Sequence, residues 1–350
     1  MGLDFLRTYD GNRLEQQELQ PLDELIDDEQ EPDLEGVDLD YEVRKRGITW
    51  QPMNLDHPNH WQPRHWQERP VRFIDGKDVG ETIAWIRSPA GQPVPIRLSQ
   101  IGSVSMRVEN GECRREFEIV ERVVSMAVDL FPWTEVESFA AALQEHGFRL
   151  LSARPPDGSL SYDFEKMRKI ASNKSNSEME VLEQAAIAFN CDQPTIADGR
   201  LEPRRGGFDE KESPIFGVIK MQRKDYLPFQ EKQVLYQLNA GQRTPVFSIA
   251  RGRLPVVTWY LRLAGNNRTT PNGGIVRVEA SQNWFEKHHR YDWDFVNQLS
   301  KTIYEYRCRE RSYDRASVSL HPIVRGEESL CSLFSPLSIL THRFYRLTQL

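Results

Sequence analysis

The sequence has few of the features that mark secreted, membrane or zinc-cysteine proteins. Its 350 residues include only four cysteines, widely spaced and without a CxxC pair: Cys113, Cys191, Cys308 and Cys331. This spacing argues against structural zinc and a disulfide framework, and it favours a reducing cytoplasm. No apolar run approaches the ~20 residues of a membrane span. The first residues lack a basic region followed by an apolar core, so we expect no secretory signal and no membrane segment.

Several enzyme motifs are also missing. The chain contains no GxSxG, HExxH or GxxxxGK[ST] pattern. These patterns are typical of serine hydrolases, zinc proteases and phosphate-binding loops, so an unrelated hydrolase or kinase has no support. Without a phosphate-binding loop, any use of ATP is expected to come from a partner.

The charge distribution divides the chain into two regions. Residues 1–42 hold 15 acidic residues against two arginines, a net charge of −13, so the remainder carries +6 of the chain's total of −7. With 39% hydrophobic residues, the chain is long enough to bury a sizeable core. The mildly basic remainder is compatible with a nucleic-acid partner.

We therefore expect an acidic N-terminal extension rich in Trp, His and Pro over residues 1–70 and a main domain over 71–350. The acidic leader is either a solvated, partly disordered segment or an arm that docks on a basic surface. Within 49–70, three histidines and three tryptophans follow no zinc spacing. The prediction is that these tryptophan rings pack onto the body or onto a second subunit.

Two Asp-Gly pairs follow apolar segments that resemble buried strands. Val71–Ile74 leads into Asp75 and Gly76, and Thr195–Ala197 leads into Asp198 and Gly199. In each case we expect the strand to end at the carboxylate and the glycine to turn the backbone. Two such strand ends can bring two carboxylates together, which is one way to build a divalent-metal site.

The order of predicted elements starts with three antiparallel strands over 71–76, 81–87 and 94–108; the stretch 113–128 has no clear type. Helices are predicted over 133–146, 162–190, 292–309 and 321–334, and strands over 214–220, 244–249, 256–263 and 274–279. A strand that carries Asp75, a helix that carries an acid, and a fourth strand that carries Asp198 resemble the ribonuclease-H-like fold, a mixed sheet flanked by helices. In that fold such acids hold one or two Mg²⁺ or Mn²⁺ ions.

Short segments resemble a specific family, the NurA nucleases, over roughly residues 70–350. The segments are Phe73–Gly76, Leu182–Ala186, Ile196–Leu201, Pro214–Lys220, Thr258–Leu261, Gly274–Glu279 and Leu320–Ile323. The resemblance implies a manganese-dependent deoxyribonuclease, with Mg²⁺ as the alternative, acting on single-stranded DNA and duplex ends. It also implies a homodimer docked on a HerA-type hexameric translocase, in DNA end processing or phage defence.

Carried over by position, the resemblance assigns three metal ligands, Asp75, Glu183 and Asp198. Glu180 lies on nearly the same helical face as Glu183 and stays open as the alternative. His321 falls where the family's last motif lies and is an accessory candidate.

Other charged residues have interpretations of their own. Lys220, at a strand end, either contacts the scissile phosphate or is an exposed lysine. Arg277 and Glu279 are expected to pair along one strand face, and Arg204 and Arg205 suit phosphate contacts. A non-catalytic, nucleic-acid-binding or assembly subunit on the same fold remains the second hypothesis, which the presence of all three acids disfavours.

Overall fold

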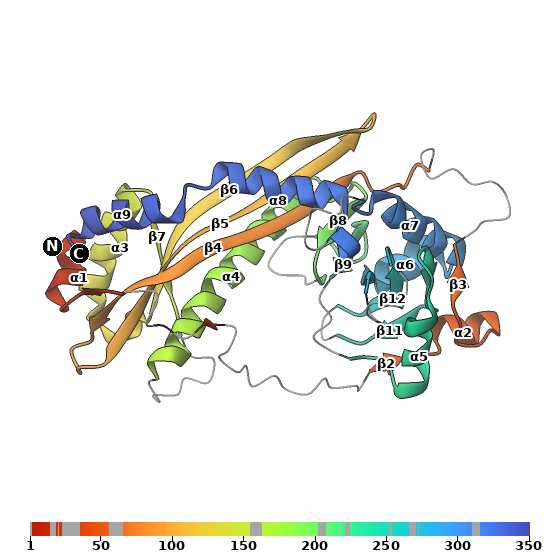
Figure 1. Cartoon of the computed structure of the whole chain (residues 1–350), viewed down its shortest axis with the longest axis horizontal. Coiled ribbons are helices and arrows are strands. Elements are labelled where there is room, and N and C mark those ends of the chain that lie inside the picture. Colours follow the sequence, from red (N-terminus) through yellow and green to blue (C-terminus); the bar gives the residue numbers. More distant parts are fainter. Residues whose placement is uncertain are drawn as a thin grey trace.

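The chain folds around one long mixed β-sheet with helices on both faces (Figure 1). The computed structural model describes residues 2–14, 19, 21–22, 36–55, 66–154, 163–201, 208–220, 225–251, 254–265, 271, 273–309 and 316–350. Within them the strands are β1 (Asn12–Arg13), β2 (Val37–Asp38), β3 (Met53–Asn54), β4 (Arg72–Arg87), β5 (Pro93–Glu109), β6 (Glu112–Met126), β7 (Arg149–Ser152), β8 (Thr195–Asp198), β9 (Ile215–Ile219), β10 (Gln242–Arg243), β11 (Phe247–Ile249), β12 (Val256–Arg262) and β13 (Ile275–Ser281).

The helices agree well with the periodicity of the sequence. They are α1 (Phe5–Thr8), α2 (Tyr41–Arg46), α3 (Trp133–Glu145), α4 (Phe164–Ala188), α5 (Phe229–Gln237), α6 (Gln282–His289), α7 (Trp293–Tyr306), α8 (His321–Leu333) and α9 (Leu337–Thr348), with short 3₁₀ turns at Gly2–Asp4, Val128–Leu130 and Ala316–Val318. All four predicted helices are confirmed, as α3, α4, α7 and α8. None of the helices in the described ranges is long and apolar enough to cross a membrane.

The centre of the sheet has the strand order β6-β5-β4-β8-β9. Strands β4, β5 and β6 pair antiparallel, whereas β8 runs parallel to β4 and β9 runs parallel to β8. This order, with three antiparallel strands followed by a crossover through α4, confirms the predicted ribonuclease-H-like mixed sheet flanked by helices. The sheet continues from β9 through β13, β12 and β11 to β2.

The first Asp-Gly pair does not end a strand, so that prediction is wrong. Strand β4 runs without interruption from Arg72 to Arg87 and passes through Asp75 and Gly76. The two predicted strands 71–76 and 81–87 are therefore one strand, and the third antiparallel strand is β6, in the stretch that periodicity left untyped. The second Asp-Gly pair behaves as predicted, because β8 ends at Asp198 and Gly199 has a positive φ of 114°.

Alternation along β4 divides the residues between the two faces of the sheet. Phe73 belongs to a buried cluster with Ile323 of α8. Ile74 belongs to another cluster with Ala186 of α4. Because successive side chains of a strand point to opposite faces, odd-numbered residues at the start of β4 face α8 and even-numbered ones face α4. Figure 1 shows these two helices on either side of the long strands.

Parts of the N-terminal 70 residues are packed on the rest of the chain. Phe5 and Leu6 are buried in a third cluster with residues of α3 and α9, and β1 pairs with β4. Trp50 and Trp66 pack against the core, as predicted for the tryptophans of this region. The three histidines, Trp61 and the acidic run 27–31 lie outside the described residues.

Candidate metal centre

The α8 face of the sheet carries a cluster of three carboxylates. Asp75, Asp198 and Glu327 each offer an oxygen, and these oxygens all lie within 4.8 Å of one another. Strand pairing accounts for the first two, because Phe73 pairs with Ile196 and Ile74 with Ala197, so the same register places Asp75 beside Asp198. The third comes from α8, which covers this face.

Glu327 reaches the cluster because the residue before it has no side chain. A Cβ at Gly326 would lie 3.2 Å from Cγ1 of Val104 and 3.6 Å from Cβ of Asp75. Glycine at this position therefore lets α8 lie close against β4 and β5. Glu327 is not among the ligands predicted from the sequence, because α8 also carries His321, Arg325 and Glu328 and no local pattern distinguishes Glu327.

The cluster is electrostatically crowded. Asp75 is 4% exposed, and its Oδ2 atom has no hydrogen-bond partner among the described residues. Burial, followed by the charge of Asp198, raises the pKa of Asp75 well above its usual range. Burial also raises the pKa of Asp198, although Lys220 acts in the opposite direction. Three carboxylates this close favour a bound cation, because they otherwise repel one another.

Lys220 is a cation that contacts this cluster. Its Nζ donates a hydrogen bond of 2.7 Å to Oδ2 of Asp198, and its side chain is only 7% exposed. The alternative of an ordinary exposed lysine is therefore wrong. Lys220 directly follows β9, so the parallel pairing of β8 and β9 delivers it to the site.

Glu183 lies near the cluster but on the α4 face of the sheet. A Cβ at Gly76 would overlap its Oε1 and would lie 2.7 Å from its Cδ. Gly76 thus allows a carboxylate from α4 to approach the strand beside Asp75, which is a different role from the predicted turn. Glu183 is outside the group of three oxygens, and its assignment as a ligand stays a prediction, as does the alternative Glu180.

His321 lies away from the carboxylates. It is the first residue of α8 and is exposed. Glu327 follows six residues later, about 9 Å along the helix axis. The structure therefore does not bring His321 into the cluster, and its accessory role stays a prediction. Arg204 and Arg205 lie outside the described residues.

A buried network holds the chain that follows Asp198. Glu279 is fully buried and accepts a hydrogen bond of 3.1 Å from the backbone N–H of Leu201. Its carboxylate also pairs with Arg277 at 2.6 Å and with Arg251 at 2.5 Å, which confirms the predicted pairing of Arg277 with Glu279. Burial acts to raise the pKa of Glu279, but the two arginines hold it below its usual value. The network holds the backbone at Leu201, three residues after Asp198.

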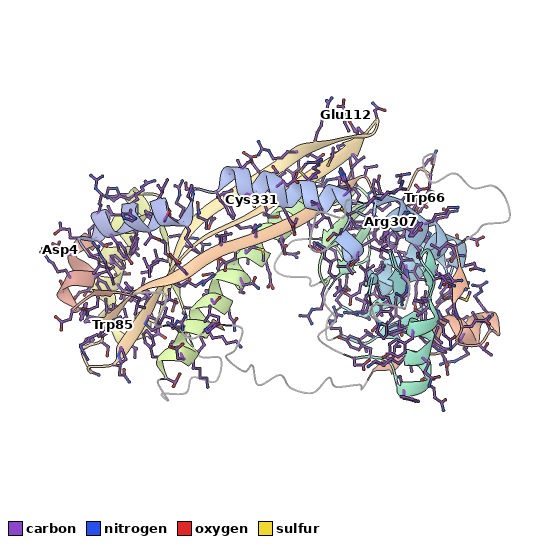
Figure 2. The ribbon with its side chains drawn as sticks, in the orientation of Figure 1. Asp4, Trp66, Trp85, Glu112, Arg307 and Cys331 are labelled. Carbon is purple, nitrogen blue, oxygen red and sulfur yellow. The ribbon has the colours of Figure 1, made fainter. Side chains whose placement is uncertain are left out.

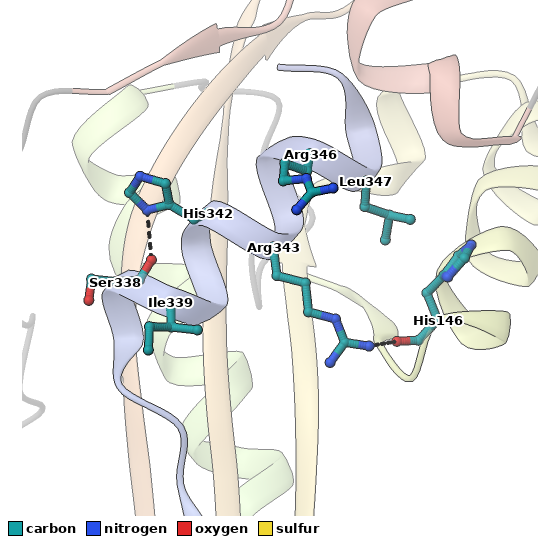
Figure 3. A pocket seen from close by; sticks show the side chains of 7 residues that line it. All are labelled: His146, Ser338, Ile339, His342, Arg343, Arg346 and Leu347. Carbon is teal, nitrogen blue, oxygen red and sulfur yellow. Dashed lines mark hydrogen bonds between the residues drawn. The ribbon is translucent and has the colours of Figure 1, made fainter.

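Among the cavities in the described part of the chain, two lie on α9 and at the start of α8, outside the cluster. One, of about 660 Å³ on α9, has no carboxylate among its described lining residues, which are His146, Ser338, Ile339, His342, Arg343, Arg346 and Leu347 (Figure 3). The other, of about 1000 Å³, lies at the start of α8 and contains His321. Neither contains Asp75 or Asp198, so the metal-binding candidate remains the cluster itself.

No family model and no curated protein matches the chain. Among solved structures it is similar to the NurA nuclease from Sulfolobus solfataricus, with a TM-score of 0.44 and 11% identity over 83% of this chain and 84% of that chain. A likeness at this level does not show a common family or a common activity.

Proposed function

We propose that the chain is a metal-dependent deoxyribonuclease that hydrolyses phosphodiester bonds in single-stranded DNA and at duplex ends. The observation that carries this proposal is the cluster of Asp75, Asp198 and Glu327 within 4.8 Å. Hard divalent cations prefer carboxylate oxygens. The buried Oδ2 of Asp75 supplies a ligand atom that has no hydrogen-bond partner among the residues that the structure describes. The residues therefore fit a divalent cation, and we propose Mn²⁺, with Mg²⁺ as the alternative.

In this proposal Asp75 and Asp198 are the central ligands, and acids of two helices approach them. Glu327 comes from α8, and Glu183 comes from α4 beside Gly76. When bound, such a cation lowers the pKa of a water molecule and neutralises charge on the phosphoryl oxygens. The clustered carboxylates would hold the cation, and the Glu279 network holds the backbone at Leu201, just after Asp198.

Lys220 has two roles in the proposed reaction. Its ammonium group balances one carboxylate while it contacts Asp198. Because it lies against the carboxylates, the same group would also be close to a phosphate bound at the site, where a fixed donor would stabilise negative charge in the transition state. Because the side chain is almost fully buried, little reorganisation is needed before it acts.

The experiment combines cation binding with DNA degradation. We expect Asp75→Asn and Glu327→Gln to abolish Mn²⁺ binding in calorimetry and to slow degradation of end-labelled single-stranded DNA by at least about 100-fold. Glu328→Gln is the matched control for Mn²⁺ binding, because Glu328 neighbours Glu327 on the same helix but is exposed and pairs with Arg325.

Two outcomes of this experiment discriminate further. A loss in Glu183→Gln as large as that in Glu327→Gln would make both helices ligand donors, whereas a small loss would leave Glu327 as the main one. A wild-type protein that binds no divalent cation and cuts no DNA, alone or with a translocase, would contradict the proposal. It would favour the non-catalytic nucleic-acid-binding subunit.

We also propose that the protein works as a homodimer with a HerA-type hexameric translocase in DNA end processing or phage defence. The support is the family resemblance of the sequence together with the absence of a phosphate-binding loop, so that ATP-driven movement of DNA needs a second protein. Light scattering of the purified protein tests the dimer, because a homodimer has twice the mass of one chain. Addition of the translocase and ATP should stimulate degradation of duplex DNA, and no stimulation would contradict this partnership.

A further inference from the structure

The larger cavity is strongly basic, in contrast to the acidic chain as a whole. It has a volume of about 1000 Å³ and lies between the start of β4, the tip of the β5–β6 hairpin, the end of α7 and the start of α8. Four arginines line it, Arg69, Arg307, Arg309 and Arg325, with one acid, Glu305, in the lining, and Arg325 also pairs with Glu328 at 2.7 Å. The charged side chains of the lining therefore sum to +3 with His321 neutral, in a protein whose net charge is −7.

Local contacts hold two of these arginines in place without neutralising them fully. Arg69 donates a hydrogen bond of 3.0 Å to the hydroxyl of Tyr306, and its guanidinium lies 3.4 Å from the Glu305 carboxylate. Arg307 donates a hydrogen bond of 2.7 Å to the backbone carbonyl of Tyr304, and its guanidinium lies over the Tyr304 ring, 3.8 Å from the centroid. Figure 2 shows Arg307 where the long strands meet the other half of the molecule. Guanidinium groups fixed in this way are suited to bind phosphate oxygens in pairs.

The cavity and the carboxylate cluster share two elements. Arg325 and Glu327 belong to α8, and Phe73 of β4 contacts Tyr306, which lines the cavity, with ring centroids 4.7 Å apart. Val71, at the cavity, precedes Asp75 by four residues, which is about 13 Å of extended strand. That distance corresponds to roughly four nucleotide steps of a B-form strand. A bound DNA strand can therefore span both places.

We infer that this arginine cavity binds a phosphate of the DNA strand several nucleotides from the bond that is cut. This inference rests on the proposed function for its substrate class, but it concerns binding and needs no metal. It assigns to the cavity the positioning of the substrate, whereas the carboxylates carry out the reaction.

The test measures binding in EDTA, so that cleavage does not contribute. Anisotropy of a labelled oligothymidine is titrated with the full-length protein over a range of salt concentrations. Arg309→Gln/Arg325→Gln should weaken binding about tenfold or more. It should also reduce the slope of log affinity against log salt by about 0.7, the value for one phosphate contact on a single strand.

A matched control removes the same charge from the other cavity. Arg343→Gln/Arg346→Gln, on α9 (Figure 3), should leave affinity and slope unchanged. Equal losses in the two double variants, or no loss in either, would overturn the inference. Oligonucleotides with a 5′-phosphate, with a 3′-phosphate and with neither identify the source, since tighter binding of one end-phosphorylated form indicates a terminal phosphate and equal binding an internal one.

Failure of this inference can be told apart from failure of the proposed function. If Asp75→Asn and wild type bind DNA equally in EDTA but wild type cuts nothing with Mn²⁺, the proposed function fails and the cavity inference stands. If wild type cuts DNA while the two double variants bind alike, the nuclease proposal stands and the cavity inference fails.

Discussion

A Cβ on Gly76 would overlap the carboxylate of Glu183, so the residue after Asp75 must lack a side chain for α4 to lie where it does. Met179 of the same helix would be overlapped as well. The requirement for glycine comes from close packing in the middle of a strand, and the backbone of Gly76 does not turn.

Gly76→Ala is therefore expected to displace Glu183 and to destabilise the fold by about 1–3 kcal/mol through overpacking. Urea denaturation measures the loss of stability, and calorimetry measures Mn²⁺ binding in the same variant. In the double variant Gly76→Ala/Glu183→Ala the loss should be smaller than the sum of the two single losses, because the overlap with the carboxylate is gone. Additive losses would show that the two residues do not interact.

Lys220→Met should separate cation binding from the reaction. The substitution removes the hydrogen bond to Asp198 and leaves the cluster more negative, so Mn²⁺ affinity should stay equal or increase. The rate of DNA degradation should fall by roughly 10²–10³-fold, which is typical for the loss of one fixed charge-stabilising donor. A parallel loss of Mn²⁺ binding would show instead that Lys220 serves only to hold Asp198.

The ion pair between Glu42 and Arg243 is expected to be important for stability. Both side chains are fully buried, and the pair joins the N-terminal region to β10. Glu42 also accepts a hydrogen bond of 2.8 Å from the backbone N–H of Val246. Removal of one partner leaves a buried charge, so Glu42→Ala should cost about 3–5 kcal/mol in chemical denaturation. The control Arg44→Ala breaks the exposed pair with Asp38 and should cost less than about 1 kcal/mol.

His289 should make stability depend on pH. Burial lowers its pKa to about 4, and its ring stacks on Phe295 with centroids 3.7 Å apart. The unfolded chain, with a His pKa of about 6.5, binds this proton more readily, so stability is fully present above pH ~6.5 and falls as the pH drops toward 4. Melting temperatures between pH 7 and 4 should fall less steeply in His289→Phe, and parallel curves would contradict the assignment.

The sequence predicts the elements better than their boundaries or their contacts. Helices with clear periodicity and caps, such as α7 after Asp292, agree with the structure because local preference and packing favour the same result. Strand β4 was divided at Gly76, since an Asp-Gly pair is a common turn and close packing by a distant helix leaves no local pattern. The third strand was missed because β6 is only partly buried over most of its length and its charged residues obscure the alternation.

For the site, too, the sequence predicts the residues on single strands better than the contacts between distant elements. Asp75 and Asp198 could be found because each follows an apolar strand that brings it to the sheet. Glu327 could not, since its place depends on how α8 packs across β4 and β5, a contact between residues about 250 positions apart. For Glu183 the sequence identified an acid beside the strand, but the face of the sheet it occupies follows only from the three-dimensional arrangement.

The position of Glu327 in the chain has a consequence for biosynthesis. Asp75 and Asp198 are translated early, but their third carboxylate belongs to α8, within the last thirty residues. Until that helix leaves the ribosome and packs against β4 and β5, the nascent chain has two of the three clustered acids. If the cluster is the catalytic centre, incomplete products of translation that stop before α8 cannot degrade DNA, and activity begins only when α8 has folded onto the sheet.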